Sequence, residues 1–189
     1  MFILGIILRP ISSLNKKIDE YSNIKSAGIL LLLVSFGRMI INLIGSMISV
    51  IFYKNINFWT GESKITVSFS NLKNLDYLSL IFKQFFGFII VIAAVAGVYY
   101  IVSLIMKQTT NYFRLVAITT TSFVPFIIVL SFISIIISYI YVPASIFAII
   151  CSFKYSILIF VIAINKEINF DDTNFSIYFH TICLTVIFI

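Results

Sequence analysis

Long apolar stretches separated by short polar segments run along almost the whole of this chain. At the rise of an α-helix, about 20 apolar residues are needed to cross the roughly 30 Å hydrocarbon layer of a bilayer. Four stretches meet that length and a fifth is shorter. The predicted spans are residues 27–53, 85–106, 115–139, 143–164 and 175–189. The pattern therefore predicts an all-α, polytopic membrane helix bundle of about five transmembrane helices.

Two segments lie outside these spans. Residues 1–26 mix apolar and charged positions, which predicts an N-terminal interfacial amphipathic helix lying along the membrane surface. Residues 54–83 form the only sizeable loop, in which the alternation at 64–70 predicts a short hairpin and 75–83 is helix-like. We interpret residues 1–189 as a single integral membrane domain.

Polar and small side chains recur in the first span at steps of three and four, which places them on one side of a helix. They are Ser35, Arg38, Asn42, Gly45, Ser46 and Ser49. One interpretation is a polar lining in which Arg38 binds a lipid headgroup or anionic solute, oriented by Asn42. The other is helix packing through small residues, with Arg38 reaching the phosphate groups at the membrane surface.

Lys154 lies inside the fourth span, about 16 Å along the helix from Pro143, which is farther than a lysine stem reaches. No carboxylate lies within any of the predicted spans to pair with it. On a helical wheel it points away from a stripe of small residues, namely Ser145, Ala148, Ser152 and Ser156. Lys154 is therefore a candidate ligand or lipid contact, and a structural role or a misplaced span is the alternative.

The third span contains a proline after four hydroxylated residues, in Thr119-Thr-Thr-Ser-Phe-Val-Pro125. Proline removes a helix donor and frees the carbonyl group of Thr121, so a kink is expected there. Hinges and cavity walls use this chemistry, and Ser and Thr also satisfy freed backbone groups in ordinary kinked helices. Pro125 is the candidate hinge.

The composition agrees with lipid as the solvent, because 61% of residues are hydrophobic and 11% are charged. The net charge of +6 does not indicate a nucleic-acid partner, since Lys and Arg lie mostly between and beside the spans. In those positions the basic residues set the orientation of the protein in the membrane. Seven Lys and Arg residues lie in segments predicted to be cytoplasmic, against four in the outer loop. We expect a protein of the cell membrane with a cytoplasmic N-terminus and its C-terminus outside.

Nothing among the polar residues indicates catalysis. His180 is the only histidine and has no partners for a zinc site or a catalytic triad, so we interpret it as an interfacial side chain. Cys151 and Cys183 both lie in apolar stretches and are interpreted as small buried hydrophobic residues. The sequence contains no phosphate-binding loop and no hydrolase motif. We expect no enzyme activity, no metal and no cofactor.

Three features follow one another in a recognisable order. They are Ile7-Leu-Arg-Pro10 with the amphipathic run behind it, the first long span, and Lys107-Gln-Thr-Thr-Asn-Tyr-Phe-Arg-Leu-Val-Ala-Ile-Thr-Thr-Thr-Ser-Phe-Val-Pro125. This order resembles the bacterial branch of the Yip family, membrane proteins named for interaction with small Rab-type GTPases. The resemblance implies five spans, an inner N-terminus and a non-catalytic role in membrane organisation or trafficking. The lack of a long polar region before the first span argues against a Rab-type GTPase as partner.

Two functions are compatible with these observations. The first is a non-enzymatic protein that binds membrane lipid or other membrane proteins, including copies of itself, through its small-residue stripes. The second is a small permease or transporter subunit in which Arg38, Asn42 and Lys154 line a polar pathway and Pro125 is the hinge.

Overall fold

The computed structural model describes residues 18–56, 63–170 and 173–188 of the chain. Most of the predicted interfacial helix, residues 1–17, lies outside the described residues. The elements in chain order are η1 (Ile18–Tyr21), α3 (Ile24–Ile51), β1 (Phe52–Ile56), β2 (Ser63–Val67), η2 (Ser70–Asn74), α4 (Tyr77–Ile105), α5 (Tyr112–Ser122), α6 (Val124–Ile128), η3 (Val129–Ile133), α7 (Ser134–Ile140), α8 (Val142–Ile168) and α9 (Thr173–Phe188). The predicted all-α membrane helix bundle is confirmed, because the described residues form four helices long and apolar enough to span a bilayer and a shorter apolar α9.

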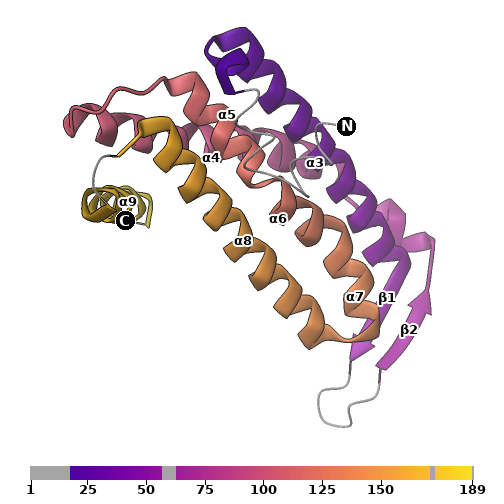
Figure 1. Ribbon diagram of the computed structural model, residues 1–189. Coiled ribbons are helices and arrows are strands. Elements are labelled where there is room, and N and C mark those ends of the chain that lie inside the picture. Colours follow the sequence, from indigo (N-terminus) through magenta and orange to yellow (C-terminus); the bar gives the residue numbers. More distant parts are fainter. Residues whose placement is uncertain (1–17, 57–62, 171–172, 189) are drawn as a thin grey trace.

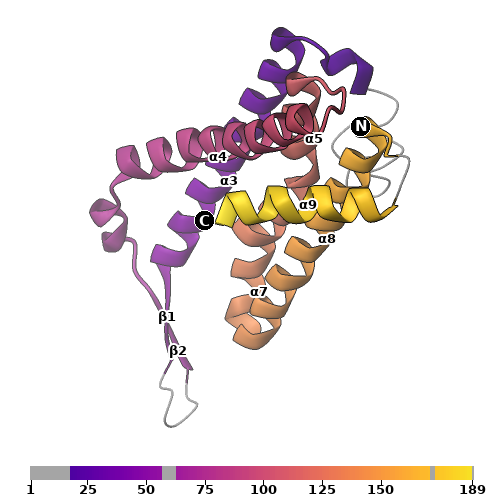
Figure 2. The same cartoon turned by 90° about the vertical axis from the view of Figure 1, so that its left-hand side faces the viewer.

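The helices run in two directions (Figures 1 and 2). α3, the succession α5 to α7, and α8 lie alongside one another, whereas α4 and α9 run across them in Figure 2. Hydrogen bonds fix which ends meet. The Asn111 side chain donates to the carbonyl group of Ser22 at 3.0 Å, and the Tyr139 hydroxyl donates to that of Phe52 at 2.6 Å. α3 and the α5–α7 succession are therefore parallel, because their starts meet at one end of the bundle and their ends at the other.

Side-chain caps explain where three helices begin. Asn23 accepts a hydrogen bond from the backbone N–H of Ser26 at the start of α3, Asp76 caps α4 in the same way, and Asn111 caps α5. The second span was predicted from residue 85, but the Asp76 cap starts α4 at Tyr77, so the helix-like lead-in and the span form one helix. α8 ends at Asn169, which adopts a left-handed conformation with φ of 54°.

The predicted hairpin is present and lies between α3 and α4. β1 and β2 pair antiparallel, with Phe52 opposite Val67 and Ile56 opposite Ser63. The first span was predicted to run to residue 53, but α3 ends at Ile51 because the next five residues pair with the alternating, β-branched segment at 63–67.

The third span is not one regular helix. α5 ends at Ser122, α6 begins with Pro125 in its first turn, and η3 is a stretch of π-helix that widens the coil over Val129–Ile133. α5 is the centre of the core, since every residue from 115 to 122 is buried. The hydroxyl groups of Thr119, Thr120 and Thr121 donate to carbonyl groups four residues earlier at 2.7–2.8 Å, so these polar side chains are satisfied within their own helix.

Gly45 is the point where α3 approaches the third span most closely among the described glycines. A Cβ atom at this position would lie 2.6 Å from Cδ1 of Ile135 and 2.7 Å from the backbone oxygen of Ser131. Only glycine fits here, because the oxygen atom belongs to backbone that cannot rotate away. The small-residue side of the first span is thus a packing surface at Gly45.

Replacing Gly45 with alanine is expected to separate α3 from η3 and α7 and to lower the free energy of unfolding by about 1–3 kcal/mol. Unfolding in mixed micelles with increasing sodium dodecyl sulfate would measure this loss. Gly37→Ala is the matched control in the same helix, since a Cβ at Gly37 meets no atom within 4 Å. Equal stability of the two variants would show that the close approach at Gly45 is not needed.

α9 is attached to α4 and α8 by a buried hydrogen-bonded network. The amide oxygen of Asn165 accepts from Nε2 of His180 and from the hydroxyl of Ser176, each at 2.7 Å. Because Nε2 of His180 donates, Nδ1 is the acceptor for the Tyr99 hydroxyl at 3.2 Å. His180 was predicted to be interfacial, but it is 7% exposed and its ring joins three helices.

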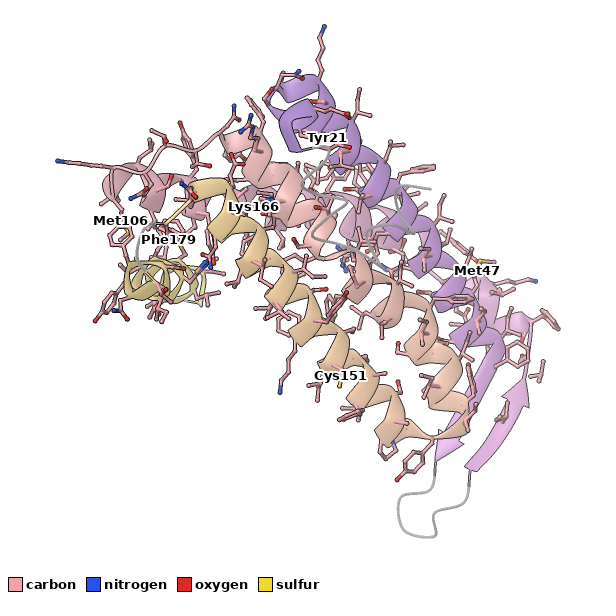
Figure 3. The ribbon with its side chains drawn as sticks, viewed as in Figure 1. Tyr21, Met47, Met106, Cys151, Lys166 and Phe179 are labelled. Atoms are coloured by element: carbon pink, nitrogen blue, oxygen red, sulfur yellow. The ribbon has the colours of Figure 1, made fainter. Side chains whose placement is uncertain are left out.

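Apolar contacts complete the attachment of α9. Phe179 lies where α9 meets the bundle, and its ring contacts that of Tyr99 at 5.6 Å between centroids (Figure 3). Cys183, on the same helix, is buried as predicted, whereas Cys151 is exposed on α8 because it falls outside the buried side of that helix. The two cysteines therefore differ in accessibility, with Cys151 on the outer surface of α8 and Cys183 in the contact between α9 and the bundle.

Asn165→Ala is expected to loosen α9, because it leaves the donors of His180 and Ser176 buried without an acceptor, at a cost of about 1–3 kcal/mol. The measurement is the rate at which a maleimide labels Cys183 in a Cys151→Ser background, which should rise. Thr181→Ala is the control, since Thr181 is exposed and its hydroxyl donates only to Ile177 of its own helix. If Cys183 is labelled at the same rate with and without Asn165→Ala in the Cys151→Ser background, the role of Asn165 is contradicted.

Candidate functional site

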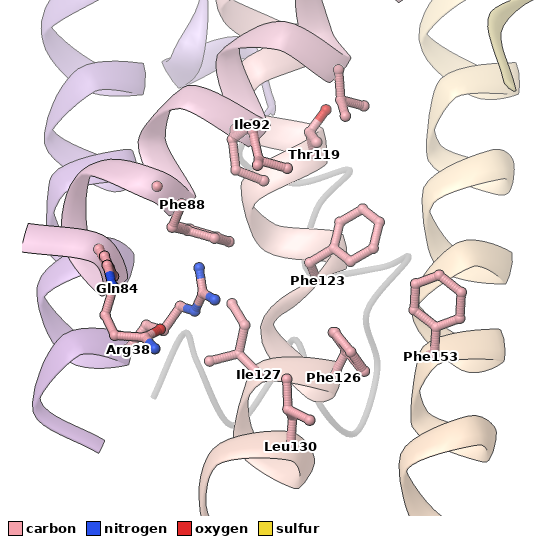
Figure 4. Close-up of a pocket in the computed structure, with 14 residues that line it drawn as sticks. Arg38, Gln84, Phe88, Ile92, Thr119, Phe123, Phe126, Ile127, Leu130 and Phe153 are labelled. Atoms are coloured by element: carbon pink, nitrogen blue, oxygen red, sulfur yellow. The ribbon is translucent and has the colours of Figure 1, made fainter. Parts of the chain in front are cut away.

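A cavity of about 450 Å³ lies where α3 and α4 face the irregular third span and α8 (Figure 4). Its wall is mostly apolar and aromatic, and its polar groups are few. The polar or charged residues that line it are Arg38, Lys83, Gln84 and Thr119. Such a combination is typical of a site for a small molecule that is apolar over most of its surface.

Arg38 supplies the charge inside this cavity. Its guanidinium group lies over the ring of Phe88 on α4, 4.8 Å from the ring centroid. Figure 4 shows the side chain turned across the bundle into the cavity, between Phe88 and Ile127. This geometry differs from the one expected for an arginine that extends along its helix to the membrane surface. Within residues 18–56, 63–170 and 173–188, no carboxylate pairs with the guanidinium group.

Asn42 lies one helical turn after Arg38, beside the cavity. Its amide Nδ2 donates to Oε1 of Gln84 at 2.8 Å. Arg38 contacts Phe88, and Asn42, four residues later in α3, contacts Gln84, four residues earlier in α4. This pairing shows that α3 and α4 run in opposite senses where they cross. Asn42 positions Gln84 at the edge of the cavity and is not itself a lining residue.

Lys154 lies apart from Arg38 and Asn42. It is exposed on α8 and is not among the residues that line the cavity, although the preceding Phe153 is. The helical wheel placed Lys154 away from Ser145, Ser152 and Ser156, and the structure agrees, since those serines are buried. The sequence grouped Arg38, Asn42 and Lys154 as candidate contacts, and the fold brings only the first two together.

Pro125 lies at the break in the third span and shapes the cavity wall. The helix is interrupted at Phe123, and the residues that follow the proline, Phe126, Ile127 and Leu130, line the cavity. The backbone N–H of Phe126 donates to the hydroxyl of Ser156 on α8 at 3.2 Å. Ser156, a member of the small-residue stripe of α8, therefore accepts a hydrogen bond from a backbone N–H at the break in addition to allowing close packing of the helices.

Ser156→Ala is expected to lower the free energy of unfolding by about 1–3 kcal/mol, because the N–H of Phe126 loses its acceptor in a buried site. Thermal unfolding in detergent would detect the loss as a lower midpoint. Ser152→Ala is the matched control, since the Ser152 hydroxyl donates to Ile149 of its own helix. If both variants unfold at the same temperature, the hydrogen bond across the helices does not support the break.

Several lining residues could not be assigned from the sequence. Lys83 was the last residue of the predicted loop, Gln84 fell between that loop and the second span, and Phe88 was one of many apolar residues in the second span. The helix-like pattern at 75–83 was the available signal, because a helix continuing through it places Gln84 and Phe88 one turn apart on one face. In the part of the chain that the structure describes, no group of three His, Cys, Asp or Glu residues could hold a metal ion.

Taken together, the apolar helices and the mostly apolar cavity define an integral membrane protein built as a helix bundle. The chain belongs to the Yip family, because the Yip1 domain matches residues 4–189. Searches of curated proteins and of solved structures gave no match to this chain.

Proposed function

We propose that this Yip-family protein acts without catalysis in membrane organisation or trafficking, by holding a membrane lipid in the cavity beside Arg38. The observation that carries the proposal is the cavity itself: a mostly apolar wall with its cationic and amide groups gathered on α3 and the first turns of α4. An amphiphile, with one polar end and an apolar body, is the class of ligand that matches such a wall.

The cavity is also open towards the surroundings of the bundle. Val91 and Phe153 line it and are 57% and 39% exposed, so parts of the wall belong to the outer surface of α4 and α8. In a bilayer that surface faces hydrocarbon, and an acyl chain can lie partly inside the cavity and partly in the membrane.

The permease alternative has less support. It needs Arg38, Asn42 and Lys154 along one polar pathway, and Lys154 is exposed on α8 outside the cavity. A polar pathway would also need more hydrophilic groups than the aromatic wall offers.

We further propose that the N-terminus lies in the cytoplasm of a cell-membrane protein. The start of α5 meets the end of α8 through the ion pair of Arg114 with Glu167 at 3.4 Å, and it meets the residues before α3 through Asn111. This end of the bundle thus gathers Arg114, Lys107 and Lys166, as the positive-inside rule requires of a cytoplasmic face.

Filling the cavity tests the proposal. Gly87 lines it, and a Cβ there meets no atom within 4 Å, so Gly87→Leu is expected to occupy space that lipid would fill. Protein purified in a neutral detergent should retain lipid, measured by extraction and mass spectrometry, and Gly87→Leu should retain at least about threefold less. Gly97→Leu is the matched control on α4, with equal free space and no part in the cavity. Equal lipid in all three proteins would overturn the proposal.

A further inference from the structure

We infer that the lipid held in this cavity is an anionic phospholipid whose phosphate group binds Arg38, with Lys83 as a second cationic contact. This inference rests on the proposed function and adds the chemical class of the ligand. Three observations carry it: the charge of Arg38, which no carboxylate of the described residues pairs with, the arrangement of the neighbouring amides, and the shape of the apolar wall.

The guanidinium group of Arg38 has donors to spare. It carries five N–H groups, and among the described residues its contact with the face of Phe88 satisfies none of them through a hydrogen bond. Lys83 lines the same cavity, and no Asp or Glu of residues 18–56, 63–170 and 173–188 is among the lining residues. A cavity with two cations and no acidic lining residue is complementary to an anion, and a planar guanidinium fits a phosphate group through paired N–H donors.

The amides beside Arg38 are arranged so that they do not compete for its donors. Oε1 of Gln84, which lines the same cavity, could accept from a guanidinium group, but it accepts from Nδ2 of Asn42. This hydrogen bond leaves the amide nitrogen of Gln84 as a further donor at the same edge of the cavity, next to Arg38 in Figure 4. Asn42 is thus a positioning residue, because its hydrogen bond to Oε1 of Gln84 leaves the Gln84 amide nitrogen free to donate to a ligand in the cavity.

The remainder of the wall suits an acyl chain and not a small hydrated anion. Phe123, Phe126 and Phe153 come from the third span and α8 and face the cavity opposite the polar edge (Figure 4). A free phosphate or other small anion would leave these aromatic surfaces uncovered. A phospholipid places its phosphate at Arg38 and its chain against the aromatic wall, and covers both.

The test is competition between headgroups on the full chain, purified in a neutral detergent and stripped of lipid. Phosphatidylglycerol and phosphatidylcholine with identical acyl chains are titrated, and bound lipid is counted by native mass spectrometry. Both lipids carry a phosphate group, but the choline cation of phosphatidylcholine cancels the negative charge and is repelled by Arg38 and Lys83, so we expect phosphatidylglycerol to bind at least about tenfold more tightly. Arg38→Gln should abolish this preference, Lys83→Gln should reduce it, and Arg38→Lys should keep part of it, because lysine retains the charge without the planar fork.

Lys154→Gln is the matched control, because it removes one positive charge outside the cavity, and the preference should remain. Should Arg38→Gln not fold, Lys83→Gln and Arg38→Lys decide the matter through the same ratio of affinities. Equal binding of the two lipids, with binding still lost in Gly87→Leu, would overturn the anionic headgroup and leave the lipid function standing. Binding of neither lipid would overturn both. Displacement of phosphatidylglycerol by millimolar inorganic phosphate alone would show a site for a free anion and overturn the lipid as occupant.

Discussion

The absence of water in hydrocarbon is the constraint on which this structure depends, because a buried polar group without a partner in the protein is costly there. The buried hydroxyls of Ser122 and Ser131 lack a hydrogen-bond partner among the described residues, but the threonine hydroxyls of α5 and the polar side chains that attach α9 are paired. The irregular third span would otherwise be unstable there. Its break at Pro125 is tolerated because Ser156 of α8 accepts from Phe126, and the threonines of α5 bond their own helix. The same constraint fixes α9, whose buried His180 is paired on both ring nitrogen atoms. Arg38 is different, since its guanidinium group has an aromatic face but no acidic partner in the described residues.

The cavity is a consequence of how the third span meets its neighbours. Gly45 brings α3 against the backbone of Ser131 in the π-helical stretch, so the two elements are close at that level. One turn or two away, Arg38 and Gln84 face Ile127 and Leu130 across a gap. A regular helix from residue 112 to 140 would keep one spacing along its length, whereas the break and the wide turn allow close packing at one level and space at another.

Much of the fold could be predicted from the sequence, because the lengths of the apolar stretches determine the number and the approximate bounds of the membrane-spanning helices. The apolar stretches, the alternation at 64–70 and Pro125 each act locally, so the spans, the hairpin and the break follow from short windows of residues. The candidate site followed only in part. Arg38 and Asn42 share one side of a helix, which periodicity shows, but their partners Phe88 and Gln84 come from α4 and depend on how the two helices cross. The crosswise course of α4 and α9 was not predictable, because hydropathy gives the length of a helix and not its direction.

Arg38 and Lys154 illustrate why a charge within an apolar helix cannot be interpreted from its position in a span alone. Both lie well inside an apolar helix, and the sequence offered no carboxylate for either. The helix face separates them: α3 turns Arg38 towards α4 and the cavity, and α8 turns Lys154 away from the buried serines. The side-chain chemistry then matters, since a guanidinium group can lie over the ring of Phe88 and still have N–H groups to donate, whereas an ammonium group offers a point charge. The contact with Phe88 holds the group in place before a ligand arrives, so the ordering of a long side chain adds little to the cost of binding an anion there.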